Sequence, residues 1–110
     1  MLRVDRIRPD AVVILYLKEP KERFWGVLRS LDGTGVSLLG LDLHAFDDWL
    51  RQVAEDGPPE ITPSLAFFPL QRVEKILLDQ PSGTIPSLVE RFESRTGRDL
   101  LIYLGVREAS

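Results

Sequence analysis

The sequence has no cysteine and only one histidine. The lack of cysteine excludes disulfide bonds and thiolate metal sites, and it is compatible with a reducing compartment. No apolar run reaches the length of about 18 residues that a membrane-spanning helix requires. Residues 1–11 carry three arginines and two aspartates, unlike a signal peptide. We therefore expect a protein of the cytoplasm that has no membrane partner.

The single histidine also limits the catalytic chemistry of the chain. A general base or a Ser-His-Asp arrangement would have to use His44, and no serine lies in a Gly-x-Ser-x-Gly motif. The segment 32–35 (DGTG) is too short for a phosphate-binding loop and lacks its lysine, so we interpret it as a turn. The sequence predicts no catalytic residue and no cofactor.

The charge of the chain is unevenly distributed. The net charge is −3, yet residues 1–31 carry seven basic and four acidic groups, whereas residues 32–62 carry one and seven. An acidic protein is a poor general binder of nucleic acid, because affinity for phosphates depends on clustered lysine and arginine. A local basic surface formed by the first 31 residues remains compatible with the sequence.

Apolar runs separated by proline and glycine predict most of the secondary structure. Residues 11–17 (AVVILYL) are typical of a strand buried on both faces. The polar segment 18–22, which contains a proline, leads into a second strand, and the DGTG turn leads into a third. Pro69 is expected at a sheet edge or at the end of a strand. The predicted strands cover 11–17, 23–31, 36–43, 65–70 and 72–78.

Two segments have the spacing of helices. Phe46, Trp49, Leu50 and Val53 lie on one helical stripe, which predicts a helix over about 45–56 inserted between the third and fourth strands. A second helix is predicted over about 85–96, ending at Gly97. The apolar residues that follow predict a final strand over about 99–106 that pairs with another strand, a second subunit being one candidate partner.

The element order β-β-β-α-β-β-α-β predicts a single, mainly β domain of the α+β class that spans residues 1–110. Five to six bent, meandering strands are most economically arranged as a small, partly open barrel, with its core over about 11–78.

Two segments resemble the Sm-like, SH3-type small β-barrel family. The first resembles the second strand and following turn of such barrels, and the second resembles the pair of strands that closes them; the matching residues are Gly26, Val27, Leu28, Leu31 and Asp32, then Phe68, Pro69, Leu70, Val73 and Ile76. RNA-binding members of that family use an asparagine shortly after the aspartate and a later arginine-glycine pair. This chain has no asparagine and reads PLQR at 69–72. The resemblance therefore implies the fold and not the family's RNA pocket.

Basic and aromatic residues mix near the first predicted hairpin. We take Lys18, Lys21, Arg23 and Trp25 as candidate contacts for nucleic acid or for a protein partner. The aromatic residues have a second interpretation as core, because Phe24 and Trp25 point to opposite faces of a strand. Trp49 is likewise expected in the core, with docking of a partner as the alternative.

Asp42, His44, Asp47 and Asp48 form the densest group of potential metal ligands. Oxygen-rich groups suit magnesium or manganese, but the first turn of a helix attracts carboxylates in any case. We favour the second interpretation and predict no metal site.

These observations predict a non-catalytic binding or scaffolding domain that self-associates as a homo-oligomer and can also bind another protein. An RNA-binding regulator of the Sm-like type is the first alternative. A small metal-dependent enzyme that uses residues 42–48 is the second.

Overall fold

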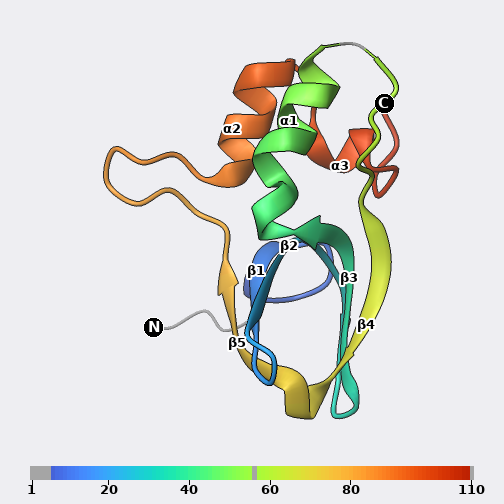
Figure 1. Ribbon diagram of the computed structural model, residues 1–110, viewed down its shortest axis with the longest axis vertical. Coiled ribbons are helices and arrows are strands. Elements are labelled where there is room, and N and C mark those ends of the chain that lie inside the picture. The colour runs from blue at the N-terminus through green and yellow to red at the C-terminus, as the bar shows by residue number, and fades with distance from the viewer. Residues whose placement is uncertain (1–5, 56, 110) are drawn as a thin grey trace.

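The computed structural model describes residues 6–55 and 57–109. The chain forms a compact α+β structure in which helices pack at one end of a five-stranded antiparallel sheet (Figure 1). The strands are ordered β4-β3-β2-β1-β5 across the sheet. Their bounds are β1 Val12–Leu17, β2 Glu22–Leu31, β3 Gly35–Asp42, β4 Ser64–Pro69 and β5 Val73–Leu78. The mainly β class and the first five predicted strands are confirmed.

Both faces of the sheet carry apolar side chains that pack into a core. On the inner face of the curled sheet, Val13, Leu15 and Leu17 belong to a cluster with buried residues of β2, β3 and β4. On the opposite face, which we call the helix face, the cross-strand partners Ile14 and Trp25 pack against the helices. Strand β1 is half-buried or buried throughout, in agreement with its continuous apolar sequence.

Strands β4 and β5 follow each other in the sequence but lie at opposite edges of the sheet. A three-residue 3-10 helix, η3 (Leu70–Arg72), is their only connection. So short a link joins two edge strands only because the sheet curls and brings its edges together at that end (Figure 1). Within the described part of the chain β4 and β5 form no ladder with each other, so the sheet is curled but not closed.

Two glycines allow the backbones of β2 and β3 to approach closely. Gly26 and Gly40 are cross-strand partners. A Cβ atom added to Gly40 would lie 2.1 Å from the carbonyl oxygen of Trp25 and 2.8 Å from the Cα of Gly26. Both neighbours are backbone atoms, which cannot move aside as the end of a flexible side chain can.

We expect Gly40→Ala to lower the free energy of unfolding by about 1–3 kcal/mol or more, because the added methyl group overpacks a site walled by backbone. Urea denaturation followed by circular dichroism measures the change. Gly33→Ala is the matched control, since a Cβ atom there would meet nothing within 4 Å. Equal stability of the two variants would contradict the assigned role of Gly40.

The segment 32–35 is a turn, as predicted, and it joins β2 to β3. The Asp32 carboxylate accepts hydrogen bonds from the Thr34 hydroxyl (2.6 Å), the Thr34 amide (2.8 Å) and the Gly35 amide (3.3 Å). These hydrogen bonds favour the ionised carboxylate and lower the pKa of Asp32, the Thr34 hydroxyl contributing most. The carboxylate is thus part of the turn itself and has no need of a ligand.

Three helices form a layer over part of the helix face: α1 (Phe46–Ala54), α2 (Leu88–Thr96) and α3 (Leu100–Tyr103). A 3-10 turn, η2 (Leu43–Ala45), precedes α1. The predicted stripe of α1 is buried, and the ring of Trp49 stacks on Phe92 of α2 with centroids 5.1 Å apart. The expected core position of Trp49 is confirmed. None of the helices within the described residues is long and apolar enough to cross a membrane.

The strand predicted over 99–106 is wrong, because this segment contains α3 and a turn. Gly97, with φ of 71°, ends α2, and Asp99 then caps a new helix by accepting a hydrogen bond from the Ile102 amide at 3.1 Å. Leu100 is buried in the helix layer, and Tyr103 packs against the same cluster. A short apolar run fits a strand and a buried helix equally well, and here the two neighbouring caps decide for the helix.

A single carboxylate, that of Asp79, joins the sheet to the helix layer. It lies just after β5 and accepts a hydrogen bond from Trp25 Nε1 at 3.1 Å. It also accepts hydrogen bonds from the amides of Leu88 (2.9 Å) and Val89 (2.8 Å), which belong to the first turn of α2. Asp79 therefore satisfies two free amides of the helix start and the only polar atom of a buried tryptophan side chain.

We expect Asp79→Ala to lower the free energy of unfolding by about 2–4 kcal/mol, because the indole N–H and two helix amides lose a charged acceptor. Urea denaturation with an unchanged m-value measures this loss. Asp79→Asn keeps one acceptor oxygen of similar shape and should fall between the wild type and the alanine variant. A change within about 0.5 kcal/mol for Asp79→Ala, as for an ordinary surface position, would show that the carboxylate does not join the layers.

Candidate binding site

The structure separates the four candidate contacts predicted from the sequence. Lys18, Lys21 and Arg23 are exposed at the β1–β2 hairpin. Trp25 is fully buried (0% exposed), so its predicted role as a contact is wrong. Its side chain points to the helix face, where it packs edge-on against Phe46 with centroids 4.9 Å apart. The helix layer covers this part of the sheet. The sequence of β2 alone does not reveal that helices from elsewhere in the chain bury Trp25.

The helices cover only one end of the helix face, and the uncovered part carries Tyr16. Tyr16 of β1 is the cross-strand partner of Arg23 on β2 and of Lys75 on β5. Directly paired residues point to the same face of a sheet, so one aromatic ring stands between two cations. The Lys75 ammonium lies over the Tyr16 ring, 4.7 Å from its centroid.

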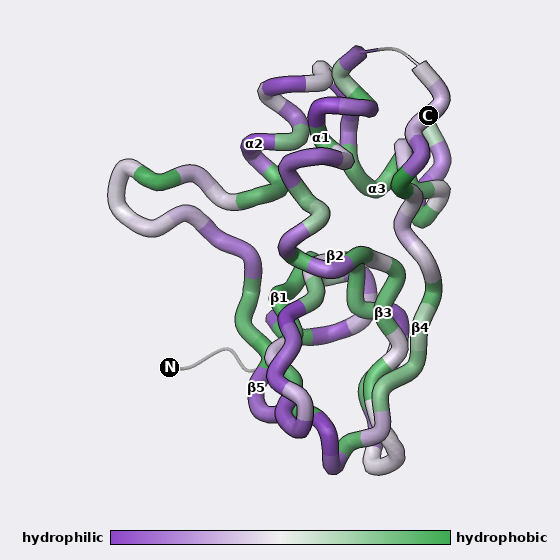
Figure 2. The backbone as a smooth tube through the Cα atoms, viewed as in Figure 1, coloured by the Kyte–Doolittle hydropathy of each residue, from purple (hydrophilic) through white to green (hydrophobic). Residues whose placement is uncertain are grey.

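These three side chains line a hollow of about 440 Å³, which we call the Tyr16 hollow. Its lining comes from β1, β2, β5, the β1–β2 hairpin and η2: Tyr16, Leu17, Lys21, Glu22, Arg23, His44, Glu74 and Lys75. Two of the predicted contacts, Lys21 and Arg23, therefore belong to one hollow, whereas Lys18 is not part of its lining. Figure 2 shows the hairpin and the adjoining start of β5 as a hydrophilic region at one end of a largely apolar sheet.

Cations outnumber free carboxylates around the Tyr16 hollow. Glu22 is engaged by Arg72 at 2.9 Å, and Arg72 also donates to the carbonyl oxygens of Lys18 and Pro20. Across the described ranges, no carboxylate pairs with the side chains of Lys21 or Arg23. The hollow thus combines unneutralised positive charge with an aromatic surface.

Sequence reasoning did not identify Tyr16 and Lys75 as site residues. Tyr16 lies within an apolar run that reads as core, and Lys75 is 59 positions further along the chain. The antiparallel pairing of β5 with β1, which is irregular between Tyr16 and Leu17, places Lys75 beside Tyr16. The period of two in β1 places Tyr16 on the same face as Ile14, but only the extent of the helix layer leaves it accessible.

A second surface is the free edge of the sheet at β4. Leu65 and Phe67 are 68% and 55% exposed, the highest exposures of apolar side chains on the sheet. The hydrogen bond from the Leu70 amide to the Thr34 carbonyl (3.0 Å) sets the alternation of the β3–β4 ladder. The amides of Leu65 and Phe67 consequently point away from β3, and Pro69, which has no N–H, occupies the next outward position. Figure 2 shows β4 as an apolar strand along the side of the molecule.

The acidic group of residues 42–48 is engaged by neighbouring groups of the protein. Asp42 accepts a hydrogen bond from the His44 amide (2.8 Å) and lies 3.2 Å from its Nδ1. Asp47 pairs with Arg91 of α2 at 2.7 Å, and Asp48 pairs with Arg51 at 3.6 Å. Among the residues that the structure describes, no group of three or more histidine, cysteine, aspartate or glutamate side chains is arranged to hold a metal ion.

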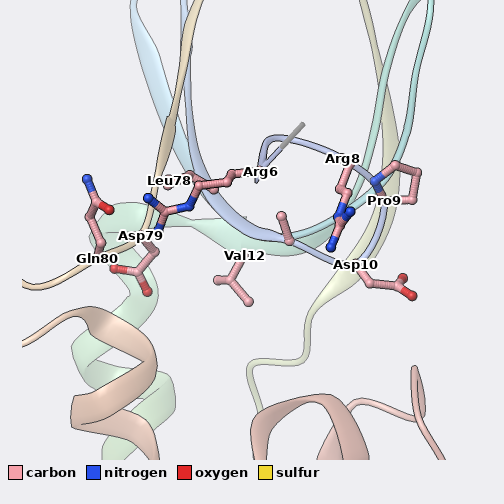
Figure 3. Close-up of a pocket in the computed structure, with 9 residues that line it drawn as sticks. Arg6, Arg8, Pro9, Asp10, Val12, Leu78, Asp79 and Gln80 are labelled. Atoms are coloured by element: carbon pink, nitrogen blue, oxygen red, sulfur yellow. The ribbon is translucent and has the colours of Figure 1, made fainter. Parts of the chain in front are cut away.

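A further hollow of about 460 Å³ lies where the N-terminal segment crosses the end of β5 (Figure 3). The Arg6 side chain extends toward Asp79 and Gln80, whereas Arg8 lies on the opposite side, beside Pro9 and Asp10. The carboxylate of Asp79 is already engaged by Trp25 and α2. This hollow offers two guanidinium groups but has no aromatic residue in its lining.

No family model matches this chain, and no curated protein and no solved structure matches it significantly. The arguments for function therefore rest on the geometry of these surfaces.

Proposed function

We propose that this protein is a non-catalytic binding or scaffolding domain that self-associates through the edges of a partly open, Sm-like or SH3-type barrel. The strand order, with the two edge strands joined by the single 3-10 turn η3, supports this barrel type. Because β4 and β5 approach each other only at η3, the edge of each strand remains available for pairing with a strand of another chain. Self-association through these edges is the function that the geometry favours.

The observation that carries the proposal is the apolar, uncharged edge of β4. Soluble proteins protect sheet edges with charged residues, bulges or covering segments. Strand β4 (SLAFFP) has no charged residue, and its single protective feature is Pro69 at the end. Leu65 and Phe67 offer outward amides and carbonyls together with largely exposed apolar side chains. This combination suits the addition of another strand.

The proposed occupant of the β4 edge is strand β5 of a second copy. Strand β5 is the other free edge of the same sheet, and its Leu77 is 43% exposed. Pairing β4 with β5 of the next copy covers both edges of every chain, whereas pairing β4 with β4 leaves β5 uncovered. Such a head-to-tail interface forms a ring if the rotation closes and an extended chain if it does not.

We expect the wild-type protein to sediment as an oligomer and the double variant Leu65→Lys/Phe67→Lys to sediment as a single chain. Two lysines place like charges and desolvated ammonium groups at the interface, while both positions are exposed enough in one chain to tolerate them. Analytical ultracentrifugation over a range of concentrations measures the mass, and circular dichroism checks the fold.

Ile85→Lys is the matched control, because Ile85 is also 68% exposed but lies outside the five strands. This variant should assemble like the wild type. A wild-type protein that remains a single chain at the highest attainable concentration would refute the self-association. An equal loss of assembly in the control would assign it to general surface hydrophobicity and not to β4.

A further inference from the structure

We propose that the Tyr16 hollow is a binding site for a nucleotide, either free or as part of single-stranded RNA. This inference goes beyond self-association and uses a different part of the molecule. Its basis is the register that places Tyr16 between Arg23 and Lys75 on three adjacent strands. A partly exposed aromatic ring on a sheet, flanked by cations, provides the two contacts that a nucleotide needs: a surface for the base and charge for the phosphate.

The charges around the hollow favour an anionic ligand. Lys21, Arg23 and Lys75 contribute three positive charges to the lining. Of the two lining glutamates, Glu22 is already held by Arg72 at 2.9 Å. The other, Glu74, has no side-chain partner among residues 6–55 and 57–109, so three cations face one such carboxylate in a protein whose net charge is −3. Local charge opposite to that of the whole chain is the electrostatic feature of a phosphate site.

The ring of Tyr16 supplies the flat apolar surface. The side chain is half-buried, which fixes the ring, and the Lys75 ammonium stands over it at 4.7 Å. Lysine has a flexible stem, so its ammonium can leave the ring when a base stacks there and remain within reach of the attached phosphate. The volume of about 440 Å³ lies within the range of about 300–1,000 Å³ that is usual for small-ligand sites.

The hollow at Arg6 and Arg8 does not provide the same combination. Its guanidinium groups suit an isolated phosphate or carboxylate, but its lining contains no ring on which a base could stack. The Tyr16 hollow is therefore the site to which we assign nucleotide recognition.

The test is a binding titration of the full chain at low salt with two probes: a fluorescein-labelled, mixed-sequence single-stranded RNA, followed by anisotropy, and the four nucleoside monophosphates, followed by calorimetry. We expect Tyr16→Leu to weaken binding about tenfold, because leucine retains apolar packing but has no ring face. Tyr16→Phe retains the ring and should bind like the wild type. Circular dichroism checks that both variants fold.

The salt dependence of binding tests the contribution of the cations around the hollow. Arg23→Ala and Lys75→Ala should each weaken binding and reduce the slope of log affinity against log salt by about 0.7 for a single strand. Lys18→Ala is the matched control, because Lys18 is an exposed cation of the same hairpin that does not line the hollow. It should change the affinity little.

Saturable binding of the monophosphates identifies a free nucleotide as the ligand, and binding of the RNA alone identifies a strand; either result supports the site. Three results would overturn it: no binding of either probe, wild-type affinity of Tyr16→Leu, or an equal loss in Lys18→Ala and Lys75→Ala. Repeating the titration with Leu65→Lys/Phe67→Lys separates this test from that of self-association, because this variant is expected to be a single chain and its own β4 does not line the hollow.

Discussion

The hydrogen bonds of Asp79 are the interaction on which the arrangement of the layers depends. One carboxylate at the end of β5 holds the indole of Trp25 in the sheet and the first turn of α2. These contacts determine where the helix layer begins on the sheet. The stacking of Trp49 on Phe92 and the burial of Leu100 then extend the layer from that point. A charged acceptor is well suited to this role because it satisfies three donors that burial would otherwise leave unpaired.

The extent of the helix layer defines the accessible surface of the sheet. Trp25 and Arg23 are two residues apart on the same face of β2, yet Trp25 is fully buried and Arg23 is exposed. The boundary of the helices passes between them. Tyr16, the partner of Arg23, is left at this boundary with its ring half-buried and flanked by cations. The same layer that completes the core thus creates the Tyr16 hollow.

The curl of the sheet determines how accessible its two edge strands are. The short η3 connection brings β4 and β5 together at one end only. In the part of the chain that the structure describes, neither edge strand pairs with the other, and no strand pairs with the outer edge of β4. A fully closed barrel would have no such edge. Incomplete closure and the proposed self-association therefore have a common structural cause.

The sequence by itself determined the five strands, the two longer helices and the core position of Trp49, because period and turn residues are local properties. It did not distinguish a strand from a helix at 99–106, where an apolar run lies between Gly97 and the end of the chain. It also named Lys21 and Arg23, but it took Trp25 and not Tyr16 as the accessible aromatic residue beside them. Only the tertiary structure decided that question, because the exposure of each ring depends on where the helices end and on which residues of β5 lie beside β1. Both are set by contacts between segments far apart in the chain, and no local pattern records them.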